Sequence, residues 1–209
     1  TVLPAWLPSL ESIAGEFSMR LEPASFDDCA AAMTTASSDF MLAYTNALMP
    51  MPLDPKAFPS VVIERDRFLP VSAPDERGRP RHPVPGIAPN QPSSYLAYTQ
   101  SSGFGRLLNH WLHGREQSLN LVRFFESHLA GVLKIMACEG RGLTWLAARY
   151  VAAEVAAGRL VRAGSRDFVI DIEVRMFRHP GRMSAACENV WNAAVQLADN
   201  TMRQDHRSI

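Results

Sequence analysis

Polar side chains that can hold a small ligand follow two of the strands that the sequence predicts. Where a strand-type run ends and a helix-type run follows, the backbone N–H groups and the dipole at the helix start favour an anion. Serine at such positions also caps helices without any ligand, so both interpretations stay open. The residues concerned are Thr99, Gln100, Ser101 and Ser102 after one strand, and Ser127 and His128 after the next, where they are expected to begin a helix.

Two apolar strand-type runs supply further candidates for the walls of a ligand site. Thr45 follows the run 40–44, and Trp145 lies in the short run 143–146. Each could line a cleft. A tryptophan on an apolar strand is more often a core residue, and Thr45 is equally compatible with core or loop, so the alternative stays open for both.

His128 allows three interpretations. Its imidazole, with an ordinary pKa of about 6.5, could bind an anion or respond to pH, or it could be a polar residue of a first helical turn. A metal ligand is the third, but no histidine, cysteine or carboxylate accompanies it at metal-ligand spacing. We therefore expect neither a metal site nor a cofactor.

Catalytic motifs are not found in the sequence. It contains no GxSxG, Walker loop, HExxH or CxxC, and the segment SGFG at 102–105 lacks the remainder of a dinucleotide fingerprint. Nothing pairs a nucleophile with a base. The sequence therefore predicts a binding domain and no enzyme.

The composition excludes several classes of partner. Lysine plus arginine and aspartate plus glutamate both number 21, so no excess of positive charge indicates nucleic acid or an anionic membrane. No run of about 18 apolar residues predicts a membrane span. Cys29, Cys138 and Cys187 form no paired motif. Buried, reduced thiols and a cytoplasmic location are expected.

The order of predicted elements favours the α/β class. Helical spacing at 3–13, a strand at 17–22, a helix capped by Ser25 and a strand at 40–44 are followed by a proline-rich stretch with strands at 61–63 and 68–72. A second α/β series ends with a strand at 168–177 and a final helix. We expect two lobes with a ligand cleft between them, lobe I formed by 1–73 plus 163–209 and lobe II by 74–162.

This order of motifs resembles the effector-binding domain of LysR-type transcriptional regulators. The segments that carry the resemblance are LPAWLPSL, FDDCAAAMTTASSDFMLAY, IERDRFLPVSAPD, FFESHLAGVLKIMACEGRGLTWL and AAEVAAGRLVRAG. The resemblance implies two Rossmann-like lobes, similar to type 2 periplasmic binding proteins, with the candidate residues above in the interlobe cleft. It also implies an N-terminal winged helix-turn-helix, which is absent from these 209 residues.

Three segments are similar to the hypochlorite-responsive branch of that family: SYLAYTQSSGFGRLLNHWL, LTWLAARY and VIDIEVRMFRHPGRM. That branch has an important methionine just after the serine of the pocket helix, where this chain has His128. Methionines at apolar positions, such as Met41 and Met176, are expected to fill the core, although a thioether can also be oxidised.

The resemblance implies a sensor of a small molecule, an anion or an oxidant, which controls transcription by the intact protein. The partners expected are the effector, a second copy in a homodimer or homotetramer, and DNA through the missing N-terminal domain only, with no membrane. A solute-binding protein of a transport system has the same architecture and is the alternative.

Overall fold

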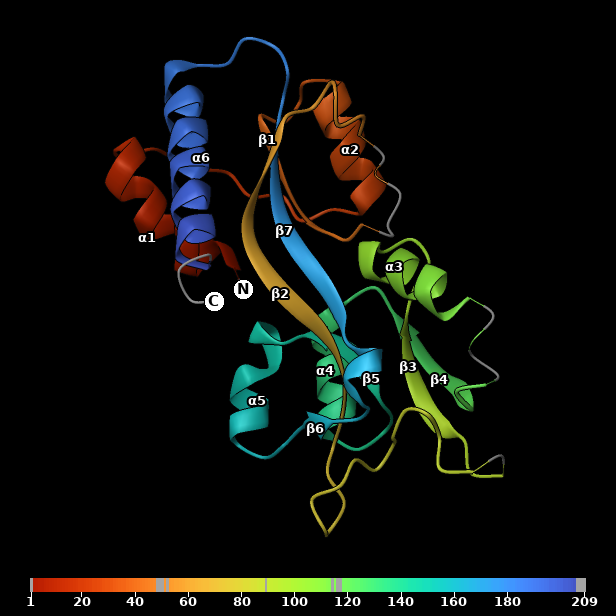
Figure 1. The fold of residues 1–209 in the computed structure, drawn as a ribbon. Helices are drawn as coiled ribbons and strands as arrows, with labels where there is room; N and C mark the ends of the chain where they lie inside the picture. The colour runs from red at the N-terminus through yellow and green to blue at the C-terminus, as the bar shows by residue number, and fades with distance from the viewer. Residues whose placement is uncertain are drawn as a thin grey trace. The chain divides into compact units, whose positions relative to one another are not determined.

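The computed structural model describes residues 2–47, 51, 53–88, 90–113, 115 and 118–205, which divide into two compact units. Unit 1 comprises Thr1–Arg65 and Glu173–Ile209, and unit 2 comprises Asp66–Ile172. The chain passes between the units twice, once within strand β2 (Ser60–Ser72) and once within strand β7 (Ile170–Arg178) (Figure 1). The sequence placed these passages at 73/74 and 162/163, after β2 and before β7.

In its described residues, unit 1 contains three helices, strand β1 and parts of β2 and β7. Antiparallel pairing of β1 with β7 runs from Phe40↔Arg178 to Thr45↔Glu173. Ser25 caps the second helix, as predicted, because its Oγ accepts a hydrogen bond from the Asp28 N–H at 3.2 Å. The elements are α1 (Val2–Ala14), α2 (Phe26–Thr34), β1 (Phe40–Thr45) and α6 (Ala185–Asp205), and α1 lies along α6 in Figure 1.

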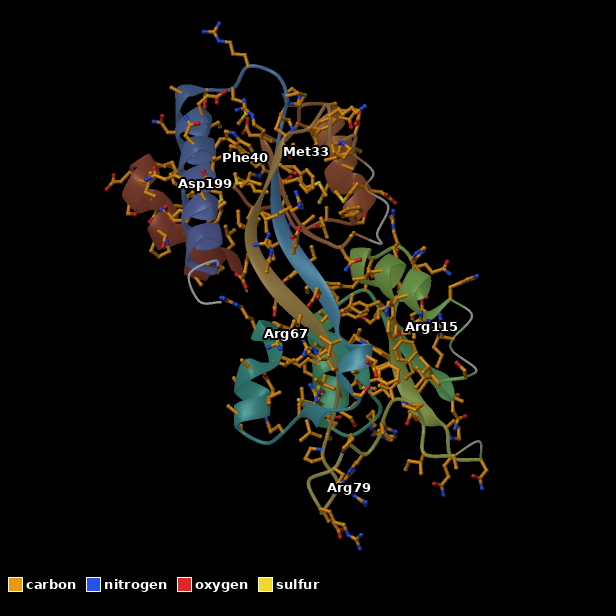
Figure 2. The ribbon with its side chains drawn as sticks, viewed as in Figure 1. Met33, Phe40, Arg67, Arg79, Arg115 and Asp199 are labelled. Atoms are coloured by element: carbon orange, nitrogen blue, oxygen red, sulfur yellow. The ribbon has the colours of Figure 1, made fainter. Side chains whose placement is uncertain are left out.

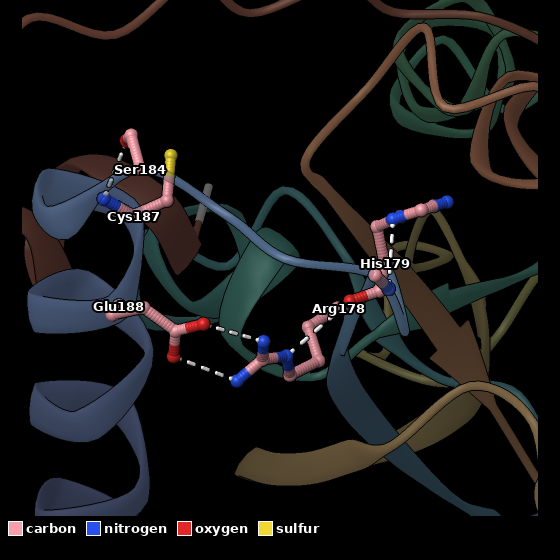
Figure 3. A network of polar contacts seen from close by, with 6 residues as sticks. Arg178, His179, Ser184, Cys187 and Glu188 are labelled. Carbon is pink, nitrogen blue, oxygen red and sulfur yellow. Dashed lines mark hydrogen bonds and ion pairs between the residues drawn. The ribbon is translucent and has the colours of Figure 1, made fainter.

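The core of unit 1 lies where β7 and β2 face α1 and α6. Period-two alternation along β7 turns Val174 and Met176 inward, as the sequence predicted. An ion pair fastens β7 to α6: the Arg178 guanidinium donates to both Glu188 oxygens at 2.9 and 2.8 Å (Figure 3). The buried cluster consists of Leu10, Ile63, Val174, Met176, Val190, Ala193 and Ala194.

The strand predicted at 17–22 is wrong. This segment is irregular, and the side chains of Met19 and Leu21 are exposed. Alternation of apolar and polar residues gives a strand only when a neighbouring strand supplies hydrogen bonds, and no described strand pairs with this segment.

Unit 2 combines two sheets with short helices. In one sheet, β2 pairs antiparallel with β5 and β6, and in the other β3 runs parallel to β4. The strand runs predicted at 61–63 and 68–72 form the single strand β2. The elements are β3 (Ser93–Tyr98), α3 (Gly103–Leu112), β4 (Leu121–Ser127), α4 (Ala130–Cys138), β5 (Thr144–Ala147), η1 (Arg149–Val151), α5 (Ala152–Ala156), β6 (Val161–Arg162) and η2 (Arg166–Phe168).

A polar loop follows β2, as the proline-rich sequence predicted. A bridge between Pro74 and Pro80 closes it. Inside, the Asp75 carboxylate accepts from the backbone N–H groups of Arg77 and Arg79, at 2.9 and 2.8 Å, and pairs with the Arg79 guanidinium at 3.1 Å. These bonds lower the pKa of Asp75, the Arg79 amide having the largest effect. Figure 2 shows Arg79 near the tip of the loop.

Other predictions concern cysteines, methionines and membranes. All three cysteines are free, as expected, but each is half-buried and not fully buried. Met41 and Met176 lie in the core as predicted, whereas Met136 and Met183, also predicted for the core, are only half-buried. In the part of the chain that the structure describes, no helix is long and apolar enough to cross a membrane, and no cluster of three metal-ligating side chains forms.

Helices α4 and α5 are joined by a carboxylate that is shared between two cations. Glu154 Oε1 lies 2.9 Å from Lys134 Nζ and 3.6 Å from an Arg159 nitrogen. Lys134 also lies over the Tyr150 ring, 4.3 Å from its centroid. The hydrogen bond from Lys134 holds the pKa of Glu154 below its ordinary value.

This shift predicts a pH dependence of stability. Because the folded-state pKa of Glu154 is depressed, its contribution is complete above the unfolded-state pKa, about 4.3, and is lost as the pH falls through the lower folded value. We expect Glu154→Gln to lower the melting temperature most near neutral pH, with the difference from wild type shrinking at acid pH. Calorimetric melts of both proteins across that range test this. A difference independent of pH would exclude the ion pair as its cause.

Candidate effector site

The two polar segments are neighbours because β3 and β4 are parallel and end together. Tyr98 is opposite Ser127 at the carboxyl ends of the strands. Immediately beyond, the Thr99 N–H donates to the Ser127 carbonyl at 3.2 Å. The structure thus brings the segment that starts at Thr99 next to the segment that starts at Ser127, both within unit 2. Carboxyl ends of parallel strands are a common place for ligands in α/β folds.

The segment after β3 is a capped turn that begins helix α3. Ser102 Oγ accepts from the Gly105 N–H at 2.9 Å and donates to the Thr99 carbonyl at 2.9 Å, and the Ser102 N–H donates to the same carbonyl at 3.1 Å. Thr99 and Ser101 share a hydrogen bond between their hydroxyls at 3.2 Å. Ser102 is therefore the helix cap, whereas Gln100 and Ser101 remain exposed.

Gly105 permits this turn to close. A Cβ at that position would lie 1.9 Å from the Thr99 carbonyl oxygen and 2.9 Å from Ser102 Oγ. The adjacent Phe104 ring stacks on Phe68, with centroids 4.3 Å apart, which fixes how far α3 stands from β2. Sequence reasoning missed this role, although the pair of glycines in SGFG at the helix start was a signal for close backbone approach.

The expected helix start at Ser127 and His128 is wrong by two residues. Ser127 is the last residue of β4, and α4 begins at Ala130 with Leu129 at the cap position. The Ser127 hydroxyl accepts a hydrogen bond from the Leu129 N–H at 3.1 Å. Pairing with β3 keeps Ser127 in the strand, and this long-range bond overrides its preference for capping. His128 is an exposed residue of the connecting turn.

Trp145 is packed in the core of unit 2. Its side chain is 0% exposed, its Nε1 donates to the Phe168 carbonyl at 2.9 Å, and its indole packs against Tyr95 and Trp111. All four residues of β5 are buried, so neither face of the strand meets solvent. This burial supports the core interpretation of Trp145.

Thr45 belongs to unit 1. It is the last residue of β1, it is buried, and its Oγ1 donates to the Glu173 carbonyl at 3.5 Å. The structure therefore gives it a hydrogen bond inside its own unit.

The thiols of Cys29 in unit 1 and Cys138 in unit 2 are poorly suited to redox sensing. Burial raises the pKa of Cys29 and of Cys138. Because the thiolate is the reactive form, a raised pKa slows oxidation at neutral pH.

The groups gathered in the Thr99 and Ser127 segments are hydroxyls, an amide, an imidazole and backbone N–H groups, which suit a small anion or polar molecule.

Residues 1–199 match the LysR substrate binding domain family. The chain belongs to this family. It is 28% identical, over 91% of its length, to two Escherichia coli proteins: the HTH domain-truncated transcriptional regulator QseD of strain O157:H7 and the HTH-type transcriptional regulator YjiE of strain K12. It spans 76% of the length of QseD and 60% of that of YjiE.

Among solved structures, the regulatory domain of HypT from Salmonella typhimurium in its apo form has 28% identity and a TM-score of 0.78, over 96% of this chain and 92% of that one. The same domain in a bromide-bound form has 27% identity and a TM-score of 0.77. The full-length protein is described as a hypochlorite-specific LysR-type transcriptional regulator.

These matches confirm the LysR family, the α/β fold and the similarity to the hypochlorite-responsive branch. The chain is the effector-binding domain of a LysR-type regulator. The two Escherichia coli relatives are both transcriptional regulators.

Proposed function

We propose that the turn Thr99–Ser102, with Ser127 and His128 beside it, binds a small anion or anionic small molecule. The observation that carries this is the hydrogen bond between Thr99 and Ser127, which joins the polar ends of two parallel strands. Helix α3 is ten residues long and begins in this turn, so its dipole favours negative charge there by about 0.3–1 kcal/mol. The bromide-bound form of the HypT regulatory domain supports an anion.

As the signal that this chain senses, reversible binding of an effector is a better explanation than oxidation of methionine. Met33, Met41 and Met176 are in the core, where an oxidant reaches them slowly, whereas the side chain of Met19 is 48% exposed. The position after Ser127, where the resemblance to the hypochlorite-responsive branch implies a methionine, carries the imidazole of His128 in this chain. Histidine cannot become a sulfoxide, but it can donate a hydrogen bond to an anion.

The intact regulator would work in the cytoplasm as a homodimer or homotetramer that contacts DNA through a separate domain. Exposed apolar side chains on both units support self-association. Effector binding would then alter transcription by changing how subunits hold the DNA-binding domains, for which a coupling of about 1–3 kcal/mol suffices. The exposed large apolar residues are Ile13, Met19, Leu21, Ile87, Val122, Phe124, Leu129, Ile135 and Val155.

A thermal-shift screen tests the binding proposal. The ligands are halides, other inorganic anions, small carboxylates, amino acids and aromatic acids, with a trace-hypochlorite arm. A ligand at about 100 times its dissociation constant stabilises the fold by about 2.7 kcal/mol, which is about 5–10 °C for a chain of this size. We expect His128→Ala to reduce the shift that an anion gives, and His110→Ala, which changes another exposed histidine of unit 2, to leave it unchanged.

Two results would contradict the proposal. One is an anion-dependent shift that is the same in wild type and His128→Ala. The other is no shift with any anion but a reproducible change with hypochlorite, which would assign the signal to oxidation.

A further inference from the structure

The two units carry opposite net charges, which the balanced charge of the whole chain conceals. Unit 2 contains 13 of the 21 lysine and arginine residues and nine of the 21 acidic residues, so its formal net charge is +4 with histidine neutral. Unit 1 contains the other eight basic and 12 acidic residues, and its net charge is −4. A polyanion is therefore attracted to unit 2, although the composition of the chain gave no indication of one.

Five exposed arginines gather at the end of unit 2 where strand β2 enters the polar loop. The Arg81 N–H donates to the Ala73 carbonyl at 3.0 Å, and the Arg81 side chain lies against Gly140, where a Cβ would be 3.0 Å from its Nη1. Another arginine directly follows Gly140, and one on β6 is paired with Val71 near the end of β2. We call the set the arginine surface, and its members are Arg77, Arg79, Arg81, Arg141 and Arg162.

Most of these guanidinium groups have no carboxylate partner. Arg79 pairs with Asp75 at 3.1 Å. The other carboxylates of these segments, Glu76 and Glu139, are exposed, so five arginines face three acidic residues. A guanidinium is a planar fork that can bind two oxygens of one phosphate, and several unpaired forks together suit a partner that carries many phosphates. The arginines that form no ion pair among the described residues are Arg77, Arg81, Arg141 and Arg162.

The arginine surface has no apolar centre, which favours nucleic acid over an acidic protein as its partner. Interfaces between proteins have a core rich in aromatic and apolar side chains. The large apolar residues that the described chain exposes all lie outside the segments 73–82, 139–142 and 159–162. Contacts to the phosphate backbone of DNA need only positive charge and hydrogen-bond donors, which these segments supply.

We propose that the arginine surface binds the phosphate backbone of duplex DNA, as a second contact of the intact regulator beside its separate DNA-binding domain. A backbone contact carries no sequence information, so it adds affinity and holds unit 2 against the duplex without selecting the site. This inference is independent of the proposed anion site, because none of the five arginines belongs to the Thr99 or Ser127 segment.

Fluorescence anisotropy of a labelled duplex of scrambled sequence, titrated with the 209-residue chain, tests the proposal. The slope of the logarithm of the binding constant against the logarithm of the salt concentration counts the phosphates that the protein neutralises. Four unpaired arginines predict a slope of about −3.6, and a loss of affinity of about 100-fold between about 50 and 200 mM salt. Arg81→Gln combined with Arg141→Gln should reduce the slope to about −1.8 and the loss to about tenfold, whatever the sequence of the duplex.

A matched control removes the same amount of charge elsewhere in unit 2. Arg67 and Arg166 are exposed but lie outside the arginine surface, so Arg67→Gln combined with Arg166→Gln should keep the wild-type slope. Lysine at positions 81 and 141 should also keep the slope, because an ammonium group neutralises a phosphate as well.

A second pair of substitutions excludes a change of local packing as the cause. Arg77→Gln combined with Arg162→Gln leaves the contact of Arg81 with Gly140 intact. It should reduce the slope as much as the first pair does, with an unchanged melting temperature.

Four results would overturn the proposal. The first is no binding of the duplex at about 50 mM salt. The second is an equal loss of slope in the control pair, which would assign the effect to the overall charge of unit 2. Tighter binding of poly-glutamate than of the duplex would assign the surface to an acidic protein. Loss of the anion-induced thermal shift in the Arg81 and Arg141 variant would make this surface the anion site. Duplex binding by a chain that shows no thermal shift with any anion would contradict the proposed effector site alone.

Discussion

Gly105→Ala is expected to destabilise the protein by about 1–3 kcal/mol and to abolish the effector response. The added Cβ would lie 1.9 Å from the Thr99 carbonyl oxygen, well inside van der Waals contact. That oxygen also accepts the hydrogen bonds from the Ser102 N–H and hydroxyl, so the Thr99 carbonyl cannot move away from the added Cβ without breaking them. Helix α3 cannot move away from the Thr99 carbonyl either, because the Phe104 ring is stacked on the Phe68 ring.

Urea unfolding and the anion thermal shift together measure this effect. Gly131→Ala is the control, because a Cβ there meets only Tyr150 Oη at 3.4 Å, an ordinary contact, and alanine favours the helix. It should leave the effector response unchanged and raise stability by up to about 1 kcal/mol. Gly105→Ala with wild-type stability and a wild-type anion shift would show that the turn tolerates displacement and does not hold the ligand.

Local signals were sufficient to predict where helices α2 and α3 begin. Ser25 and Ser102 cap α2 and α3 through bonds to residues three positions later, and such bonds depend only on nearby sequence. Strands are different, because their hydrogen bonds come from distant residues. The segment 17–22 has the pattern of a strand but no described neighbour, and β4 extends to Ser127 because β3 pairs with it there.

The candidate site was predicted only in outline. The sequence identified both polar segments, and their adjacency follows from parallel strands that end together. The roles of individual side chains were harder to predict. Ser127 binds the Leu129 amide, Trp145 is buried on every side, and Gly105 acts through the absence of a side chain. Each of these facts depends on atoms that the linear sequence does not place.

Trp145→Ala is expected to cost about 3–5 kcal/mol, the largest loss of stability for any substitution considered. The indole is fully buried, meets Tyr95 edge-on at 5.7 Å and Trp111 at 6.0 Å between ring centroids, and binds the Phe168 carbonyl. Alanine leaves a cavity among these aromatic rings and removes the hydrogen-bond donor. Because Trp111 belongs to α3 and Tyr95 to β3, the two elements that frame the Thr99 turn lose their common support.

A graded pair of variants separates packing from hydrogen bonding. Trp145→Phe keeps most of the aromatic volume but leaves the Phe168 carbonyl without its indole donor, which should cost about 1–3 kcal/mol. The free energy of unfolding, measured at equilibrium, should therefore be highest for wild type, lower for Trp145→Phe and lowest for Trp145→Ala. If Trp145 were instead a ligand contact, both variants would keep nearly wild-type stability and lose anion binding. Because Trp145 is buried, we expect a large loss of stability in Trp145→Ala and an anion-induced thermal shift that is retained in Trp145→Phe.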